Sequence, residues 1–179
     1  PLCGGGSLLF AAALLGEPAP EWVLGSDADE GAVDLARENL ALLTPEGCAR
    51  RRAQIEEHLR AFGRQSFAEA LGSLDRIAAQ GRGVRAAAVV YDVFSGAAPD
   101  LPVRPNLVVC DLPYGDLVDW RGGAQAPGAA FLPAIGRHLE AGAVVVACMD
   151  KRQQLEAPGF VRLDRQQVGK RRFAVYQRE

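Results

Sequence analysis

The stretch from Asn106 to Gly115, NLVVCDLPYG, joins an apolar run to an acid, a proline and an aromatic residue. Its first five residues are rich in β-branched side chains, which predicts a strand, and their lack of alternation predicts a central strand covered on both faces. Pro113 has no N–H and disfavours helix at Leu112, so we expect the chain to leave the sheet at Asp111. This acid then stands beyond the carboxyl end of a strand, where ligands of α/β proteins usually bind.

The chemistry that suits this stretch is the transfer of a chemical group to a planar amino nitrogen. Such a nitrogen is a poor nucleophile because its lone pair is delocalised. Hydrogen bonds from the amine to the Asp111 carboxylate and to the Leu112 carbonyl would favour its attack. Tyr114 would stack on the acceptor ring and hold the nitrogen in line with the incoming group. The predicted catalytic residues are therefore Asp111, Leu112, Pro113 and Tyr114.

Three further features predict a cofactor. Cys3-Gly-Gly-Gly-Ser7 precedes an apolar run, so backbone amides at a helix N-terminus would meet a carboxylate or phosphate. Asp27 ends a predicted strand and suits the two hydroxyls of a ribose, while Asp92 ends another and suits an adenine amino group. A dinucleotide fits less well because the third glycine of G-x-G-x-x-G is lacking, so nicotinamide chemistry ranks last. An adenosine bearing an amino acid remains, which is S-adenosylmethionine, and its predicted ligands are Cys3, Gly4, Gly6, Asp27, Asp92, Val93 and Asp111.

The elements that must position these residues alternate between strand and helix. We expect a buried helix over 8–15, a helix over 29–43 capped by Asp29, and further helices over 46–62, 66–79 and 131–139. Strands are expected over 22–27, 86–91, 106–110, 144–149, 160–164 and 172–177. This order predicts an α/β fold with a doubly wound, mostly parallel sheet and a C-terminal antiparallel hairpin. The two middle helices form a predicted insert at about 45–81, since αβ connections are usually much shorter.

Composition describes an ordinary globular protein. The 179 residues carry 49% hydrophobic and 23% charged side chains with a net charge of -2, so nucleic-acid binding would depend on local basic clusters. Four scattered cysteines indicate a reducing, cytoplasmic setting without structural metal, and the apolar run 8–15 is too short to span a membrane. A glycine loop ordinarily follows a strand. We therefore expect one domain over 1–179, truncated at its amino end and lacking its first strand, with a monomer favoured.

Four motifs resemble, in order, those of class I S-adenosylmethionine-dependent methyltransferases that modify amino groups: Cys3-Gly-Gly-Gly-Ser7, Gly25-Ser-Asp-Ala-Asp29, Tyr91-Asp-Val-Phe94 and Cys110-Asp-Leu-Pro-Tyr-Gly115. The chain is most similar to the AviRa family of 23S ribosomal RNA guanine methyltransferases, which confer resistance to orthosomycin antibiotics such as avilamycin. That similarity runs through residues 25–67, through 111–122 with Trp120, and through the final hairpin. Leu112 replaces the first of two prolines of the general motif, a form shared by related guanine-modifying enzymes.

The resemblance implies a large-subunit rRNA substrate, which two basic clusters would grip. Lys151 and Arg152 follow one predicted strand, and Lys170, Arg171 and Arg172 lie in or beside the predicted hairpin turn, so both clusters would flank the site and bind phosphates. Ordinary solvated turn charges explain them equally well. Two alternatives stay open: a methyltransferase for a protein glutamine or a small-molecule amine, and a non-catalytic RNA-binding fragment.

Overall fold

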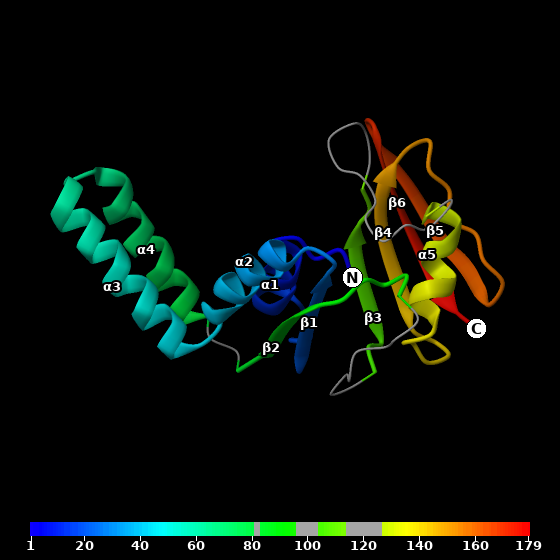
Figure 1. The fold of residues 1–179 in the computed structure, drawn as a ribbon, viewed down its shortest axis with the longest axis horizontal. Coiled ribbons are helices and arrows are strands. Elements are labelled where there is room, and N and C mark those ends of the chain that lie inside the picture. The colour runs from blue at the N-terminus through cyan, green and yellow to red at the C-terminus, as the bar shows by residue number, and fades with distance from the viewer. Residues whose placement is uncertain (81–82, 96–103, 114–126) are drawn as a thin grey trace. The chain divides into compact units, whose positions relative to one another are not determined.

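A computed structural model describes residues 1–80, 83–95, 104–113 and 127–179 (Figure 1). Contacts within the chain divide it into two compact units. The carboxyl-terminal unit comprises residues 1–2, 26–28 and 90–179, and the amino-terminal unit comprises residues 3–25 and 29–89. Among the described residues, no helix has the length and apolar character needed to cross a membrane.

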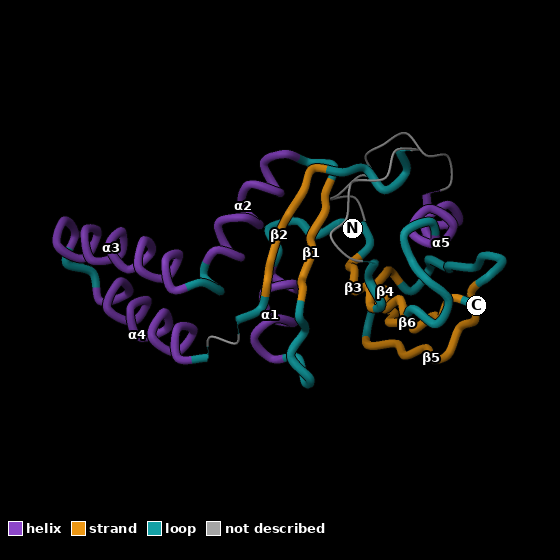
Figure 2. The backbone as a smooth tube through the Cα atoms, turned by 90° about the horizontal axis from the view of Figure 1, so that it is seen from below, coloured by secondary structure: helices purple, strands orange, loops and turns teal. Residues whose placement is uncertain are grey.

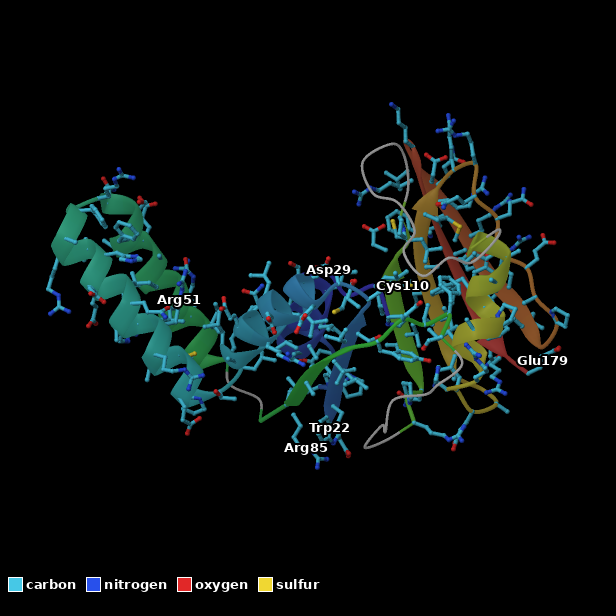
Figure 3. All side chains as sticks on the ribbon, in the orientation of Figure 1. Trp22, Asp29, Arg51, Arg85, Cys110 and Glu179 are labelled. Carbon is cyan, nitrogen blue, oxygen red and sulfur yellow. The ribbon has the colours of Figure 1, made fainter. Side chains whose placement is uncertain are left out.

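The amino-terminal unit contains α1 (Ser7–Leu15), α2 (Glu30–Ala41) and most of strands β1 (Trp22–Asp27) and β2 (Arg85–Val90). The two strands form a two-stranded sheet. Arg85 N donates to Glu21 O and Tyr91 N donates to Asp27 O, so the bonds advance in the same direction along both strands and the pair is parallel. Figure 3 shows Trp22 and Arg85 near the start of the two strands, where the guanidinium lies 4.8 Å from the centroid of the indole ring.

Helices α3 (Pro45–Phe62) and α4 (Gln65–Ala79) lie side by side as an antiparallel hairpin (Figure 2), where the sequence predicts two helices. Asp29 caps α2 as predicted, since its side chain accepts a hydrogen bond from Ala32 N. Helix α2 ends at Ala41, two residues before the predicted end. Thr44 accounts for this difference, because its side chain accepts from Gly47 N and caps α3.

Helix α1 is less buried than its apolar sequence predicts. Only Ala13 of this helix is buried, whereas Leu8 is 48% and Leu15 is 71% exposed. The prediction of a buried helix is therefore wrong for the described residues. With nearly every position apolar, the sequence carries no polar stripe to mark the solvent face.

The carboxyl-terminal unit contains a four-stranded sheet in the order β3-β4-β6-β5. Its elements are β3 (Leu107–Asp111), α5 (Pro127–Gly136), β4 (Val144–Asp150), β5 (Phe160–Val168) and β6 (Arg171–Arg178). Strands β3 and β4 are parallel, and β6 is antiparallel to both β4 and β5. The α/β architecture and the C-terminal antiparallel hairpin are thus confirmed, although the described strands lie in two sheets rather than one.

One face of this sheet packs against α5 (Figure 1). Val108 and Cys110 of β3 point into that core, whereas Leu107 is 55% and Val109 is 42% exposed on the other face. In the sheet order β3 is an end strand. The predicted cover on both faces and the predicted central position are therefore wrong for the described residues, because α5 shields only alternate side chains.

Candidate active site

The acid of the opening motif lies at the carboxyl end of β3, as predicted. Asp111 pairs with Cys148 of β4, and Leu112 N donates to Cys148 O at 2.8 Å, so the pairing continues one residue past the strand. The Leu112 side chain is only 1% exposed and anchors this turn in the core. Pro113 follows, with no N–H to extend the ladder. Tyr114, the fourth predicted catalytic residue, lies outside the described residues.

The Asp111 carboxylate lies between the core and solvent. Its side chain is 38% exposed, and Arg171 Nη1 lies 3.9 Å from Asp111 Oδ2. The other oxygen, Oδ1, is buried and has no hydrogen-bond partner among the residues that the structure describes. Burying a carboxylate oxygen without a donor is costly, and native proteins rarely tolerate it. This atom is therefore a candidate acceptor for a donor from a ligand.

Two thiols flank this acid, and both stay protonated at neutral pH. Burial, together with a hydrogen bond to the Asp111 carboxylate, raises the pKa of Cys148 to about 11. Burial likewise raises the pKa of Cys110 to about 12, and its thiol points into the core toward Val146 O. A nucleophilic cysteine requires a lowered pKa. Cys148 therefore acts as a hydrogen-bond donor to Asp111, and neither thiol is a nucleophile.

Hydrogen bonds from Gln153 stabilise the turn that follows Asp111. Its Nε2 donates to Pro113 O at 3.0 Å, and its Oε1 accepts from Asp150 N at 2.8 Å. Arg172 Nη1 in turn donates to Gln153 O at 2.7 Å. Sequence reasoning missed Gln153, since it lies in an irregular segment 40 residues from its Pro113 partner and belongs to no motif.

The five predicted RNA-binding residues gather at one edge of this sheet. Lys151 N donates to Lys170 O at 2.9 Å, which joins the end of β4 to the β5–β6 turn. Val168 pairs with Arg171, so Gly169 and Lys170 form a two-residue turn, and Gly169 supplies a φ of 60°. Because β3 and β4 are parallel, this edge also carries Asp111.

Within this basic group, all three guanidinium groups lie against other residues of the protein. Arg152 Nε lies 3.0 Å from Asp150 Oδ1, and the Arg152 N–H bond to that carboxylate is the main cause that lowers the Asp150 pKa. Arg172 is the residue that holds Gln153. Arg171 is the cation of the group that lies against Asp111.

The predicted ribose and adenine ligands follow neighbouring strands. Tyr91 N donates to Asp27 O at 2.8 Å, so the chain leaves β1 and β2 side by side. Asp92 Oδ1 accepts from Phe94 N at 2.9 Å, so one oxygen of this carboxylate shapes its own turn. Val93 is 4% exposed and packs in the same core as Leu112.

The carboxyl end of α5 holds the segment that carries Asp92 and Val93. Arg137 Nη2 donates to Val93 O at 3.0 Å and to Ser95 O at 3.3 Å. His138 Nε2 lies 2.9 Å from the Tyr91 hydroxyl. Burial, and then the neighbouring Arg137, lowers the pKa of His138, so the ring stays neutral near pH 7. Sequence reasoning missed Arg137, because nothing in a helix end identifies a partner 44 residues away.

The glycine loop, in the amino-terminal unit, has the backbone that its composition predicts. Gly4 has a φ of 49° and Gly6 a φ of 77°, both in the left-handed region that favours glycine. A Cβ added to Gly6 would lie 3.1 Å from the Ala36 Cβ, so close packing on α2 also requires glycine. Gly6 caps α1 without a side-chain hydrogen bond, which leaves backbone amides to face a ligand.

The carboxyl-terminal unit thus brings together all the described site residues except those of the glycine loop. Its members are Asp27, Asp92, Val93, Asp111, Leu112, Pro113, Lys151, Arg152, Lys170, Arg171 and Arg172. Cys3, Gly4 and Gly6 belong to the amino-terminal unit. Across the described ranges, no three His, Cys, Asp or Glu side chains are grouped so that they could hold a metal ion.

The chain is similar to known proteins in sequence and in fold. The family described as rRNA methyltransferase AviRa matches residues 1–171. A curated 23S rRNA (guanine(2535)-N(1))-methyltransferase from Streptomyces viridochromogenes is 33% identical, over 96% of this chain and 71% of that protein. The crystal structure of rRNA methyltransferase AviRa from the same organism has a TM-score of 0.79 at 31% identity, covering 99% of this chain and 74% of that one. TrmN from Thermus thermophilus is similar in fold alone, with a TM-score of 0.54 and 19% identity over 100% of this chain and 42% of that one.

Proposed function

From the premise that this chain belongs to the AviRa family of rRNA methyltransferases, with a class I methyltransferase fold, we propose that it methylates N1 of a guanine in 23S rRNA. The methyl donor in this proposal is S-adenosylmethionine. The observation that carries the proposal is the buried Oδ1 of Asp111, an acceptor without a partner among the described residues, at the end of β3. A guanine offers the donor that this oxygen lacks, since N1 bears a proton at neutral pH.

The residues present fit the proposed cofactor. The amides at the start of α1 suit its carboxylate, and at Gly6 an added Cβ would lie only 3.1 Å from the Ala36 Cβ. Asp27 would hold the ribose hydroxyls, while Asp92 and Val93 would hold the adenine. When bound, S-adenosylmethionine supplies a methyl group activated by its sulfonium.

Asp111 would act on the base in two ways. Its carboxylate would accept the N1–H hydrogen bond and would take the N1 proton as N1 gains the methyl group that the cofactor supplies. The Leu112 carbonyl would accept from the exocyclic amine and orient the ring. The bonds of Leu112 N and Pro113 O to their neighbours fix this turn. Stacking by Tyr114 remains part of the proposal.

The basic edge would bind the rRNA backbone. Lys151, Arg152, Lys170 and Arg172 lie at the edge that carries Asp111, where phosphate contacts would set the position of the target base. This part of the proposal predicts affinity that falls steeply with salt. We further propose that the protein is a monomer, acts in the cytoplasm and confers resistance to orthosomycin antibiotics. A protein glutamine or small amine as substrate, or a non-catalytic fragment, is not favoured by the family.

The test uses purified protein, radiolabelled S-adenosylmethionine and 23S rRNA. Label should enter RNA and not ribosomal protein. A methyl group on N1 blocks the Watson–Crick edge, so reverse transcription should stop beside a single guanine. Label found only in protein, or labelled RNA that is copied without a stop, would refute N1 methylation of guanine.

A further inference from the structure

Asp111 and Arg171 form a mixed pair of charges at the carboxyl edge of β3. Asp111 pairs with Cys148, and Arg171 pairs with Asp150, two residues farther along the same strand β4. Since side chains two residues apart share a face, Asp111 and Arg171 lie on the same face of the sheet. Their side chains are 38% and 53% exposed, so both remain accessible to a substrate.

The two groups are close without forming a tight ion pair. Arg171 Nη1 and Asp111 Oδ2 are 3.9 Å apart, whereas a charge-assisted N–H···O bond measures about 2.7–2.9 Å. A guanidinium carries five N–H donors and a carboxylate has several acceptor sites, so each group can bond a separate atom of one ligand while keeping its contacts with the protein. Arg152 lies against Asp150 and Arg172 donates to Gln153 O, so Arg171 is the arginine of this group for which a contact with Asp111 is described.

The Watson–Crick edge of guanine matches this pair. It places the N1–H and N2–H donors beside the O6 acceptor, so a carboxylate and a guanidinium side by side complement it. Adenine presents an amino donor in place of O6 and an acceptor at N1, which would leave both charges facing the wrong partner. A base edge that bonds both groups would also bring a donor to the Asp111 carboxylate, whose buried Oδ1 has no partner among the described residues.

The chemistry of N1 gives the guanidinium a second task. Loss of the N1 proton places negative charge on O6, because the ring delocalises it. A fixed cation at O6 lowers the energy of that charge as it develops, and it does so most strongly where water is partly excluded. A phosphate contact at the same residue would give no such effect on the reacting base.

We propose that Arg171 donates to O6 of the target guanine, selecting guanine and stabilising the charge that forms as Asp111 takes the N1 proton. The N1–H bond breaks toward the Asp111 carboxylate, the N1–C bond forms, and the S–C bond of the donor breaks with its electrons left on sulfur. This inference rests on the proposed function. It assigns Arg171 to the base, in place of the phosphate contact that the sequence predicts.

The test compares R171Q and R171K with R165Q, which removes one positive charge from exposed Arg165 on β5. Single-turnover transfer is followed at saturating rRNA from pH 6 to 9. R171Q should be slower by roughly 100-fold near neutral pH, the usual effect of losing one oxyanion donor. Its rate should climb with pH as solvent removes the N1 proton, and R171K should regain part of the rate because it keeps a cation. R165Q should match the wild-type protein.

Other results would overturn the inference. Wild-type rates for R171Q at saturating rRNA, with only a weaker and less salt-dependent affinity, would assign Arg171 to a phosphate. A slow R171Q with the pH profile of the wild-type protein would remove its link to N1 deprotonation. If R171Q fails to fold, R171K decides the question. A folded R171K would count against the inference if its pH profile equals that of the wild-type protein, whether the variant is fully active or inactive. Absence of guanine methylation by the wild-type protein would refute the proposed function itself, before any variant is compared.

Discussion

Replacing Arg137 with methionine tests how the proposed adenine-binding segment, which carries Asp92 and Val93, is held in place. Met preserves much of the apolar stem of Arg137 and removes the guanidinium, which donates to Val93 O at 3.0 Å and Ser95 O at 3.3 Å. Both carbonyls belong to the segment that carries Asp92. We therefore expect R137M to loosen this segment while the sheet beneath it stays folded.

The distances set the size of the effect. A hydrogen bond to a charged group contributes about 1.5–3 kcal/mol, and the shorter bond to Val93 O falls within ordinary geometry. The bond to Ser95 O is longer and more exposed, so it adds less. Both carbonyls regain water when the guanidinium is lost. A total near 2 kcal/mol follows, and since about 1.4 kcal/mol is a factor of ten, cofactor affinity should fall roughly 30-fold.

Calorimetric titration with S-adenosylhomocysteine measures this directly. R165M serves as the matched control, because Arg165 is an exposed arginine on β5 outside the site. Urea unfolding of both variants shows whether the loss is confined to binding. An R137M affinity equal to that of R165M would refute the reasoning, as would a loss of affinity explained fully by global unfolding.

Three further predictions concern Asp111, Gly6 and His138. Asp111→Asn should slow single-turnover methyl transfer at saturating S-adenosylmethionine on the order of 100-fold or more, the usual contribution of a general base; equal activity would remove Asp111 from the mechanism. Gly6→Ala should destabilise the protein by about 1–2 kcal/mol in urea, since its φ is 77° and its Cβ would lie 3.1 Å from the Ala36 Cβ; an unchanged urea midpoint would contradict this. Burial lowers the pKa of His138 below its ordinary value of 6.5, so the unfolded chain binds a proton that the folded protein does not. Stability should therefore fall as pH drops below about 6.5, and urea titrations of His138→Asn should show a shallower fall.

The order of helices and strands, and the acid at the end of β3, could be predicted because they depend on neighbours in the chain. Pro113 ends the strand through its missing N–H, and Asp29 caps α2 through its own side chain. The gathering of the basic residues could also be predicted, since a hairpin after a parallel strand brings its turn back to one edge. The exposure of one face of β3 could not be predicted, because an apolar run does not reveal whether other elements pack on both faces of a strand.

The partners of Arg137 and Gln153 were beyond prediction for a different reason. Each side chain bonds a backbone carbonyl at least 40 residues away, and a backbone carbonyl carries no residue-specific signal in the sequence. The environments of the cysteines were equally hidden. Adjacent rows of the sheet place Cys110 in the core and Cys148 against Asp111, which periodicity alone does not assign.

The sequence by itself identified the candidate site residues: an acid at the end of a strand, glycines at a helix start, and two basic turns. Those are properties of residue type and local spacing. Only the tertiary structure decided that Arg171, among five basic residues, faces Asp111 across 3.9 Å. The physical reason is strand register, because a shift of β6 by one residue against β4 would turn Arg171 to the opposite face.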